Sequence, residues 1–126
     1  MKEVMAVIRL NMMNKTKEAL SSAGITSFTA TGRVLGRGKG KVDFSLIKGA
    51  ENGSDEALAR LGSGPMLIPK RLVKVIVPDK LVTIVVDTII TTNKTGNAGD
   101  GKIFVLPVQD SVRIRTGESG DDVLDE

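Results

Sequence analysis

An α+β fold is predicted by three features of this 126-residue sequence. Two segments follow the order strand, helix, strand, and their strands are rich in branched apolar residues. A long segment rich in glycine and cations separates the two units, and a short extended piece follows the second. Two such units form a ferredoxin-like split β-α-β sandwich, in which two helices cover one face of a four-stranded antiparallel sheet. The length fits a single domain over residues 1–126.

The first unit opens with a strand at residues 4–10, which are mostly apolar and branched. A helix is predicted over residues 13–23, whose apolar side chains recur three and four positions apart. Asparagine is a favoured N-cap, and either Asn11 or Asn14 can fill that position. Gly24 then ends the helix.

A second strand is predicted at residues 28–35, after which the pattern breaks. Glycine alternates with cations from Gly36 onward, and the irregular composition continues to Pro69. Segment 36–69 is therefore predicted to be a long flexible loop, because glycine is costly to order and like charges repel. A short helix at residues 54–61 is the one element expected within it. A connection of this length is usually functional or disordered.

The second unit begins with a strand at residues 71–77. Residues 80–90 have strand-like residue types, but their length and the spacing of their polar residues favour a helix with one solvent-exposed face. A proline and an aspartate just before them are typical of a helix start. A glycine-rich loop leads to a strand at residues 102–108 and an extended piece at residues 111–115. The sheet face opposite the helices would be apolar and uncovered in a monomer, which predicts oligomerisation.

The composition narrows the function classes. The chain has no Cys and no His, so a disulfide framework, a cysteine nucleophile, the usual general base and the commonest metal ligand are all excluded. It has no Trp or Tyr to stack on bases, which argues against nucleic-acid binding. No apolar run is long enough to predict a membrane helix, and the first residues do not resemble a signal peptide. A cytoplasmic protein is the expectation.

The net charge of +3 hides an uneven distribution. Residues 118–126 are acidic and are predicted to form a disordered tail. Cations gather in the middle of the chain, at Arg33, Arg37, Lys39, Lys41 and Lys48. Such a basic segment is typical of contacts with nucleic acid, nucleotide phosphates or an acidic protein, and it is equally typical of a solvated loop.

The strongest chemical signal is the loop at residues 95–102, where three glycines and one lysine lie between two apolar runs. Glycine lets backbone N–H groups turn toward a ligand, and a run of such groups forms an anion site. Lys102 places one ammonium at the rim of this phosphate cradle. A Walker A loop is excluded because Ile103, and not Ser or Thr, follows the lysine. In an arbitrary protein, a loop of this kind is more often a plain turn.

Two arginines downstream strengthen the phosphate interpretation. Arg113 and Arg115 are two residues apart, so on an extended chain both guanidiniums would lie on one face. The arginine fork suits phosphate better than any other side chain. The glycine loop and the arginine pair together predict a phosphate-binding site.

At these residues the sequence resembles a known family, the PII nitrogen-regulatory signal proteins. Residues 95–105 resemble the family's B-loop signature, and residues 113–118 resemble its C-loop signature. Shorter matches occur in the family's order at residues 17–20, 24–26, 49–51, 69–70 and 77–79. The resemblance implies a trimer that binds ATP or ADP in the clefts between subunits. It also identifies segment 36–69 as the T-loop, which contacts target proteins.

The resemblance assigns contacts by position. The residues that it places on the nucleotide are Thr29, Gly36, Arg37, Ile76, Gly99, Asp100, Gly101, Lys102, Arg113 and Arg115. Among them, Thr29 and Ile76 line the adenine side, and the two arginines reach the phosphates from the adjacent subunit or from the far side of the same cleft. The residues that it places on the effector 2-oxoglutarate, with Mg²⁺, are Gly38, Lys39, Gly40 and Lys70. Lys70 matches the lysine that pairs with a carboxylate of this effector.

Three departures separate this chain from the usual family pattern. Gly38 replaces the glutamine that helps to hold Mg²⁺ beside 2-oxoglutarate in the family. This chain therefore lacks one side chain that the family uses to bind the effector directly. The absence of Tyr excludes uridylylation of a T-loop tyrosine. The T-loop is also longer than usual between Glu51 and Lys70.

The long, tyrosine-free T-loop and residues 34–40 resemble one subgroup, the second of the paired PII-like proteins encoded with nitrogenase in methanogens. In that subgroup the two proteins form a mixed complex, which inhibits the dinitrogenase component of nitrogenase when nitrogen is plentiful. ATP with 2-oxoglutarate relieves the inhibition. The resemblance thus implies a regulatory binding protein and not an enzyme. The alternatives are a PII protein acting on an ammonium channel or glutamine synthetase, a slow ATPase, and a nucleic-acid-binding protein.

Overall fold

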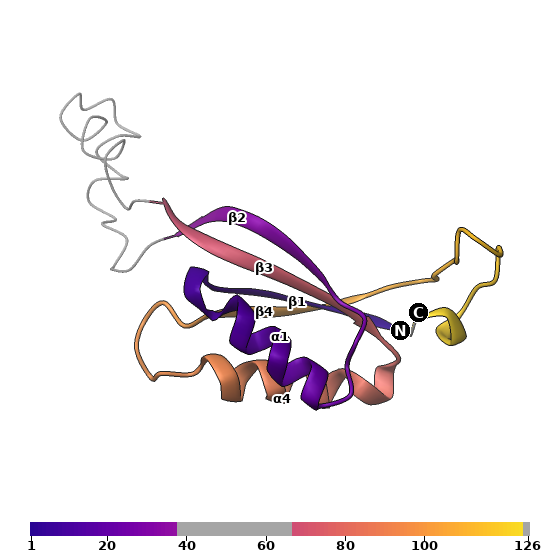
Figure 1. The fold of residues 1–126 in the computed structure, drawn as a ribbon, viewed down its shortest axis with the longest axis horizontal. Helices are drawn as coiled ribbons and strands as arrows, with labels where there is room; N and C mark the ends of the chain where they lie inside the picture. Colours follow the sequence, from indigo (N-terminus) through magenta and orange to yellow (C-terminus); the bar gives the residue numbers. More distant parts are fainter. Residues whose placement is uncertain (38–66, 125–126) are drawn as a thin grey trace, which may run out of the picture.

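The computed structural model describes residues 1–37 and 67–124. Within these ranges, four strands form one antiparallel sheet in the order β2-β3-β1-β4. Helices α1 and α4 lie side by side on the same face of the sheet (Figure 1). The predicted ferredoxin-like arrangement is therefore confirmed. The helix expected at residues 54–61 lies outside the described residues.

The main elements follow the predicted order. They are β1 (Lys2–Arg9), α1 (Met13–Ser22), β2 (Thr29–Arg37), β3 (Leu67–Val77), α4 (Val82–Asn93) and β4 (Gly101–Pro107), with 3-10 turns at Leu10–Met12, Asp79–Leu81 and Asp121–Val123. Residues 80–90 are helical from residue 82, as their length and polar spacing predicted. Strands β2 and β3 extend further toward the segment between them than predicted, because residues 36–37 and 67–70 pair as strand.

The start of α1 differs from the predicted asparagine cap. The chain leaves β1 directly into the 3-10 turn Leu10–Met12, so Met12 occupies the N-cap position and no side chain caps the helix. Asn11 lies within that turn, and Asn14 lies within the helix. The end of the helix is as predicted, because Gly24 adopts a φ of +87° just beyond it.

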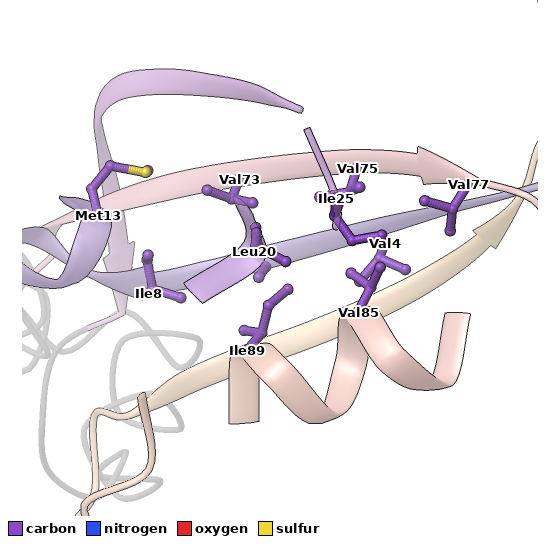
Figure 2. Close-up of a cluster of buried hydrophobic side chains, with 11 residues drawn as sticks. Val4, Ile8, Met13, Leu20, Ile25, Val73, Val75, Val77, Val85 and Ile89 are labelled. Atoms are coloured by element: carbon purple, nitrogen blue, oxygen red, sulfur yellow. The ribbon is translucent and has the colours of Figure 1, made fainter. Parts of the chain in front are cut away.

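The core lies between the sheet and the two helices. Side chains alternate along a strand, so β1 turns Val4, Ala6 and Ile8 toward the helices. The other elements bury apolar side chains against them, namely Met13, Leu20, Ile25, Val73, Val75, Val77, Val85 and Ile89 (Figure 2). Burying one large aliphatic side chain contributes about 1.5–3 kcal/mol, so this layer holds the helices on the sheet.

The opposite face of the sheet carries no helix among the described residues. On this face Met5 lies opposite Phe104, and Glu3 lies between Leu106 and Ile76 on the neighbouring strands. Phe104, Leu106 and Ile76 are 45%, 37% and 37% exposed. The expected uncovered face is therefore present. Its apolar part lies beside charged side chains, since Lys74 lies opposite Met5 and Lys102 lies opposite Val7 on the same face. A face of this kind is typical of a surface that associates with another chain.

One polar contact joins the two helices inside the core. Asn93, the last residue of α4, donates from Nδ2 to the Thr16 hydroxyl at 3.1 Å and to the Ile89 carbonyl at 2.9 Å. The Thr16 hydroxyl donates in turn to the Met12 carbonyl at 2.7 Å. Thr16 and Asn93 are both buried. The contact fixes where α4 ends relative to α1.

Replacing Gly101 with alanine is expected to destabilise the fold. Gly101 has a φ of +114°, and a Cβ there would lie 2.0 Å from the Val7 carbonyl oxygen. The free energy of unfolding should fall by about 3 kcal/mol, measured by chemical denaturation at fixed protein concentration. Gly32→Ala is the matched control, because a Cβ at Gly32 would have nothing within 4 Å. Its effect should stay below about 1 kcal/mol, and equal losses in the two variants would contradict the steric argument.

Candidate anion-binding site

The loop between α4 and β4 turns through left-handed backbone at its glycines. Gly96, Gly99 and Gly101 have φ values of +84°, +99° and +114°. No described residue other than glycine has a positive φ. The prediction that glycine gives this loop conformations forbidden to a residue with a Cβ is therefore confirmed.

The Asp100 carboxylate organises the loop from within. It accepts hydrogen bonds from the backbone N–H groups of Thr95 at 2.8 Å and Gly96 at 3.1 Å, from the Thr95 hydroxyl, and from the Arg9 guanidinium. The bonds from Thr95, followed by that from Arg9, hold the pKa of Asp100 well below its usual range. Asp100 is thus a fixed anion whose side chain is engaged inside the loop, and it acts by shaping that loop.

Arg9, to which the sequence patterns assigned no role, is part of the site. It is the last residue of β1, and its guanidinium pairs with Asp100 and donates to the Ala98 carbonyl at 3.2 Å. The Arg9 and Asp100 side chains are 23% and 25% exposed, so the pair is partly shielded from water. The available sequence signal was one cation within the otherwise apolar run at residues 4–10.

Lys70 brings a second cation to the loop. It lies in β3 between Val34 of β2 and Arg9 of β1, which places it within the sheet and not at a strand edge. The residue is 5% exposed, and its Nζ donates to the Gly99 carbonyl at 3.0 Å. Gly36 packs against its stem, since a Cβ there would lie 3.1 Å from Lys70 Cγ. A buried lysine beside a glycine loop suits an anionic ligand.

Half of the predicted nucleotide site gathers at one end of the sheet. At this end Ile8 pairs with Gly101, and Arg9 pairs with Lys70. The predicted nucleotide residues found here are Gly36, Arg37, Gly99, Asp100, Gly101 and Lys102, and the predicted effector residue Lys70 lies beside them. The predicted effector residues Gly38, Lys39 and Gly40 lie outside the described residues.

The other half lies at the opposite end. Ile76 pairs with Glu3 near the start of β1, and Thr29 and Ile76 line one cavity of about 730 Å³. The chain continues from Pro107, opposite Lys2, toward the two arginines. Because most of the eight residues of β1 separate the two ends, the rise per residue of a strand puts the ends roughly 20 Å apart. The orange loop and the yellow C-terminal segment lie at these opposite ends (Figure 1). One copy of the chain therefore does not surround one ligand with both halves.

Residues 111–113 of the predicted extended piece lead into a tight turn, and an isolated β-bridge joins Val112 to Ser119. The Arg113 N–H donates to the Glu118 carbonyl at 2.8 Å, and the Gly117 N–H donates to the Arg113 carbonyl at 2.8 Å. The Arg113 side chain also pairs with the Glu118 carboxylate at 3.1 Å. Since residues 114–116 form a turn, the argument that an extended chain puts both arginines on one face was wrong. Gly117, with a φ of +75°, makes this turn possible.

The acidic C-terminal segment is ordered over residues 118–124, where disorder was predicted. The Gly120 N–H donates to the Ser111 carbonyl at 3.0 Å, and the Ser111 hydroxyl donates to the Gly120 carbonyl at 2.9 Å. A 3-10 turn at Asp121–Val123 follows. These hydrogen bonds supply the order that the acidic composition did not indicate.

The described residues contain no helix that is both long and apolar enough to span a membrane. They also contain no cluster of three or more His, Cys, Asp or Glu side chains placed to hold a metal ion.

These features define a class of protein, a ferredoxin-like α+β domain with a glycine loop suited to phosphate or carboxylate groups and an apolar sheet face suited to self-association. The family model "Nitrogen regulatory protein P-II" matches residues 1–118. The chain belongs to this family, a family of signalling proteins, and the resemblance found in the sequence is confirmed.

Relatives with similar sequences narrow the comparison. The chain is 46% identical over 125 residues to "Nitrogen fixation nifHD region GlnB-like protein 2" of Methanobacterium ivanovii, covering 98% of this chain and 99% of that protein. It is 41% identical over 121 residues to "Nitrogen regulatory protein P-II 1" of Escherichia coli K12, covering 96% and 97% of the two chains. A crystal structure of Arabidopsis thaliana PII bound to citrate is similar, with a TM-score of 0.72, 30% identity, and coverage of 99% of this chain and 90% of that chain.

Replacing Arg9 with glutamine is expected to raise the pKa of Asp100, because the carboxylate loses a cationic partner. The measurement is an NMR titration of the Asp100 carboxyl carbon, with the Thr95 and Gly96 amides as reporters. Arg33→Gln, which removes an exposed cation from β2, is the control and should leave this pKa unchanged.

The pH dependence of the loop has a definite sign. Since the folded-state pKa of Asp100 lies below the unfolded value, its stabilising contribution is complete above the unfolded value and is lost as pH falls through the folded one. The Thr95 and Gly96 amide signals should therefore stay constant from neutral pH into the acid range. An Asp100 that titrates in the usual aspartate range would contradict the role given to its carboxylate.

Proposed function

We propose that this chain is a nitrogen-regulatory signalling protein that binds ATP or ADP in clefts between copies of itself or of a paired PII-like chain. The observation that carries the proposal is the separation of the two halves of the site to opposite ends of one sheet. Copies that pack through their open apolar faces, as a trimer, would bring the loop end of one chain against the arginine end of the next.

The loop end suits the phosphates of a nucleotide. Its glycines adopt left-handed backbone, and the close approach of Gly101 to Val7 leaves no room for a Cβ. Lys102 is the second residue of β4 and lies next to the loop, where its ammonium can meet a phosphate. In this proposal the backbone and Lys102 contact the phosphates. Asp100 contributes through the loop shape, because its carboxylate is already engaged.

The opposite end suits the base. Thr29 and Ile76 line the same cavity, together with Phe28, which gives a planar ring apolar surface to pack on. Arg113 and Arg115 follow from the same end, and from there they would reach the phosphates bound to the neighbouring copy. The Arg113 pair with Glu118 is exposed at the carboxylate, so in this proposal a phosphate would compete with Glu118 for the guanidinium.

Lys70 is the proposed contact for 2-oxoglutarate. It is buried, and it touches Gly99 of the phosphate loop, so an anion at Lys70 and a nucleotide on the loop would be neighbours. In the absence of an acidic cluster among the described residues, Mg²⁺ would be held chiefly by oxygens of the two ligands. Gly38, Lys39 and Gly40 complete the proposed effector contacts on the basis of the sequence alone.

The proposed target is nitrogenase. The relatives named for the nifHD region support a role in nitrogen fixation. We propose that segment 36–69 inhibits the dinitrogenase component when nitrogen is plentiful, and that ATP with 2-oxoglutarate relieves this inhibition. The ligands would act by favouring one arrangement of the segment over another. Moving such an equilibrium from 1:99 to 99:1 takes about 5.5 kcal/mol of differential affinity.

Lys102→Ala is expected to weaken Mg-ATP binding by about tenfold or more, because a charge-assisted contact to phosphate is lost. Titration calorimetry on the full-length protein measures the affinity, with and without 2-oxoglutarate. Lys15→Ala, which removes an exposed lysine of α1, is the matched control and should bind like the unchanged chain. Normal ATP affinity in Lys102→Ala would remove the phosphate role of this lysine.

Mixing two defective variants tests whether the site lies between copies. Lys102→Ala damages the loop end, and Arg115→Ala damages the arginine end, so each variant alone should bind ATP poorly. A mixed oligomer contains clefts that combine the intact loop of one copy with the intact arginine of another. Calorimetry on the co-assembled proteins should then recover part of the binding. No recovery in verified mixed oligomers would place both halves on the same copy.

The target is tested by affinity capture from nitrogen-replete cells, with the tagged protein as bait. Nitrogenase dinitrogenase should be retained and should elute with ATP plus 2-oxoglutarate, but with neither ligand alone. Residues 52–64 lie where segment 36–69 is longer than usual, and we propose that they contact the target. A bait without them should therefore retain less of it. Retention of an ammonium channel or glutamine synthetase in its place would favour the alternative targets.

A further inference from the structure

We infer that Val123 and Leu124 form a C-terminal wall that closes against the nucleotide base and slows release of the nucleotide. This inference rests on the proposed nucleotide function of the cavity beside Thr29 and Ile76. It assigns a positioning role to residues in a segment whose acidic composition had indicated a disordered tail.

The cavity has walls from two distant parts of the chain. Residues 26–29 and Ile76 line one side, and Val123 and Leu124 line the other. Its polar lining is Thr26, Ser27, Thr29, Glu3 and Lys74, with Lys74 Nζ 4.0 Å from Glu3 Oε1. A purine has two apolar faces and a polar edge, so the apolar side chains of Phe28, Ile76, Val123 and Leu124 beside these polar groups match its chemistry.

Two hydrogen bonds anchor the start of the wall. Gly120, with a φ of +93°, is held by two hydrogen bonds to Ser111. Beyond it the bonds are local, from the Val123 N–H to the Gly120 carbonyl at 3.3 Å and from the Leu124 N–H to the Asp121 carbonyl at 3.2 Å. The arginine turn is closed by hydrogen bonds of its own, between Arg113 and Glu118 and between Gly117 and Arg113.

The position of the wall decides what it can influence. Val123 and Leu124 line the cavity that we propose for the base, whereas the glycine loop lies at the other end of the sheet. They would contact the adenine base, which ATP and ADP share, so they should increase the affinity for both nucleotides to the same degree. Because the contact is apolar and non-directional, its loss should appear mainly as faster dissociation.

The test compares base-containing and base-free ligands. The double variant Val123→Ser with Leu124→Ser keeps the acidic charges of the segment and removes its apolar surface. Its affinities for ATP and ADP should fall by about tenfold each, while its affinity for inorganic tripolyphosphate should stay unchanged. Ile84→Ser, an exposed apolar position on α4, is the matched control and should bind all three ligands as the unchanged chain does.

A truncation after Gly120 provides a second variant, because it retains the hydrogen bonds to Ser111. It should lower the ratio of ATP to tripolyphosphate affinity in the same way as the double variant. Unchanged ATP affinity in both variants would overturn the role of the wall and leave the proposed nucleotide function standing. A loss of tripolyphosphate affinity equal to the loss of ATP affinity would have the same meaning. Absence of ATP binding in the unchanged chain would overturn the proposed function and the wall with it.

Discussion

The central strand β1 is the constraint on which the rest of the structure depends. It pairs with β3 along one edge and with β4 along the other, while its alternate side chains form the floor of the core. A slip of one residue in either pairing would turn Val4, Ala6 and Ile8 away from the helices, so the hydrophobic pattern fixes both registers. The same registers set Arg9 beside the glycine loop and Glu3 beside the base-side cavity.

The charges at the loop end are arranged in a definite order. Arg9 is engaged by Asp100, and together they hold the loop with little net charge. Lys70 donates to the Gly99 carbonyl and Lys102 follows the loop directly, so both ammonium groups lie at the end of the sheet where we propose that an anion binds. An anion therefore meets a loop that is already shaped, which reduces the ordering cost of binding. Arg9 and Asp100 thus shape the loop, whereas Lys102 is the residue proposed to contact the ligand.

Much of the fold could be predicted from the sequence, because apolar periodicity reports directly on burial. The four strands, both helices and the left-handed glycines of the loop agree with that pattern. The side-chain contacts were less accessible. Arg9 and Asp100 are 91 residues apart in sequence, and only the register of β1 and β4 brings them together. The arginine turn was missed because the spacing of two arginines was given more weight than Gly117 and Glu118, which close it.

The Thr16–Asn93 contact has a consequence for the loop that follows it. An interface made only of aliphatic side chains tolerates small sliding of one helix along another, whereas a single buried polar contact selects one register. Asn93 is the last residue of α4, so this register also sets the point from which the glycine loop departs. The helices thereby act as a positioning frame. A shift of α1 along its axis would pull on Asn93 through the Thr16 hydroxyl and so move the start of the glycine loop. The packing of the two helices thus helps to position the loop.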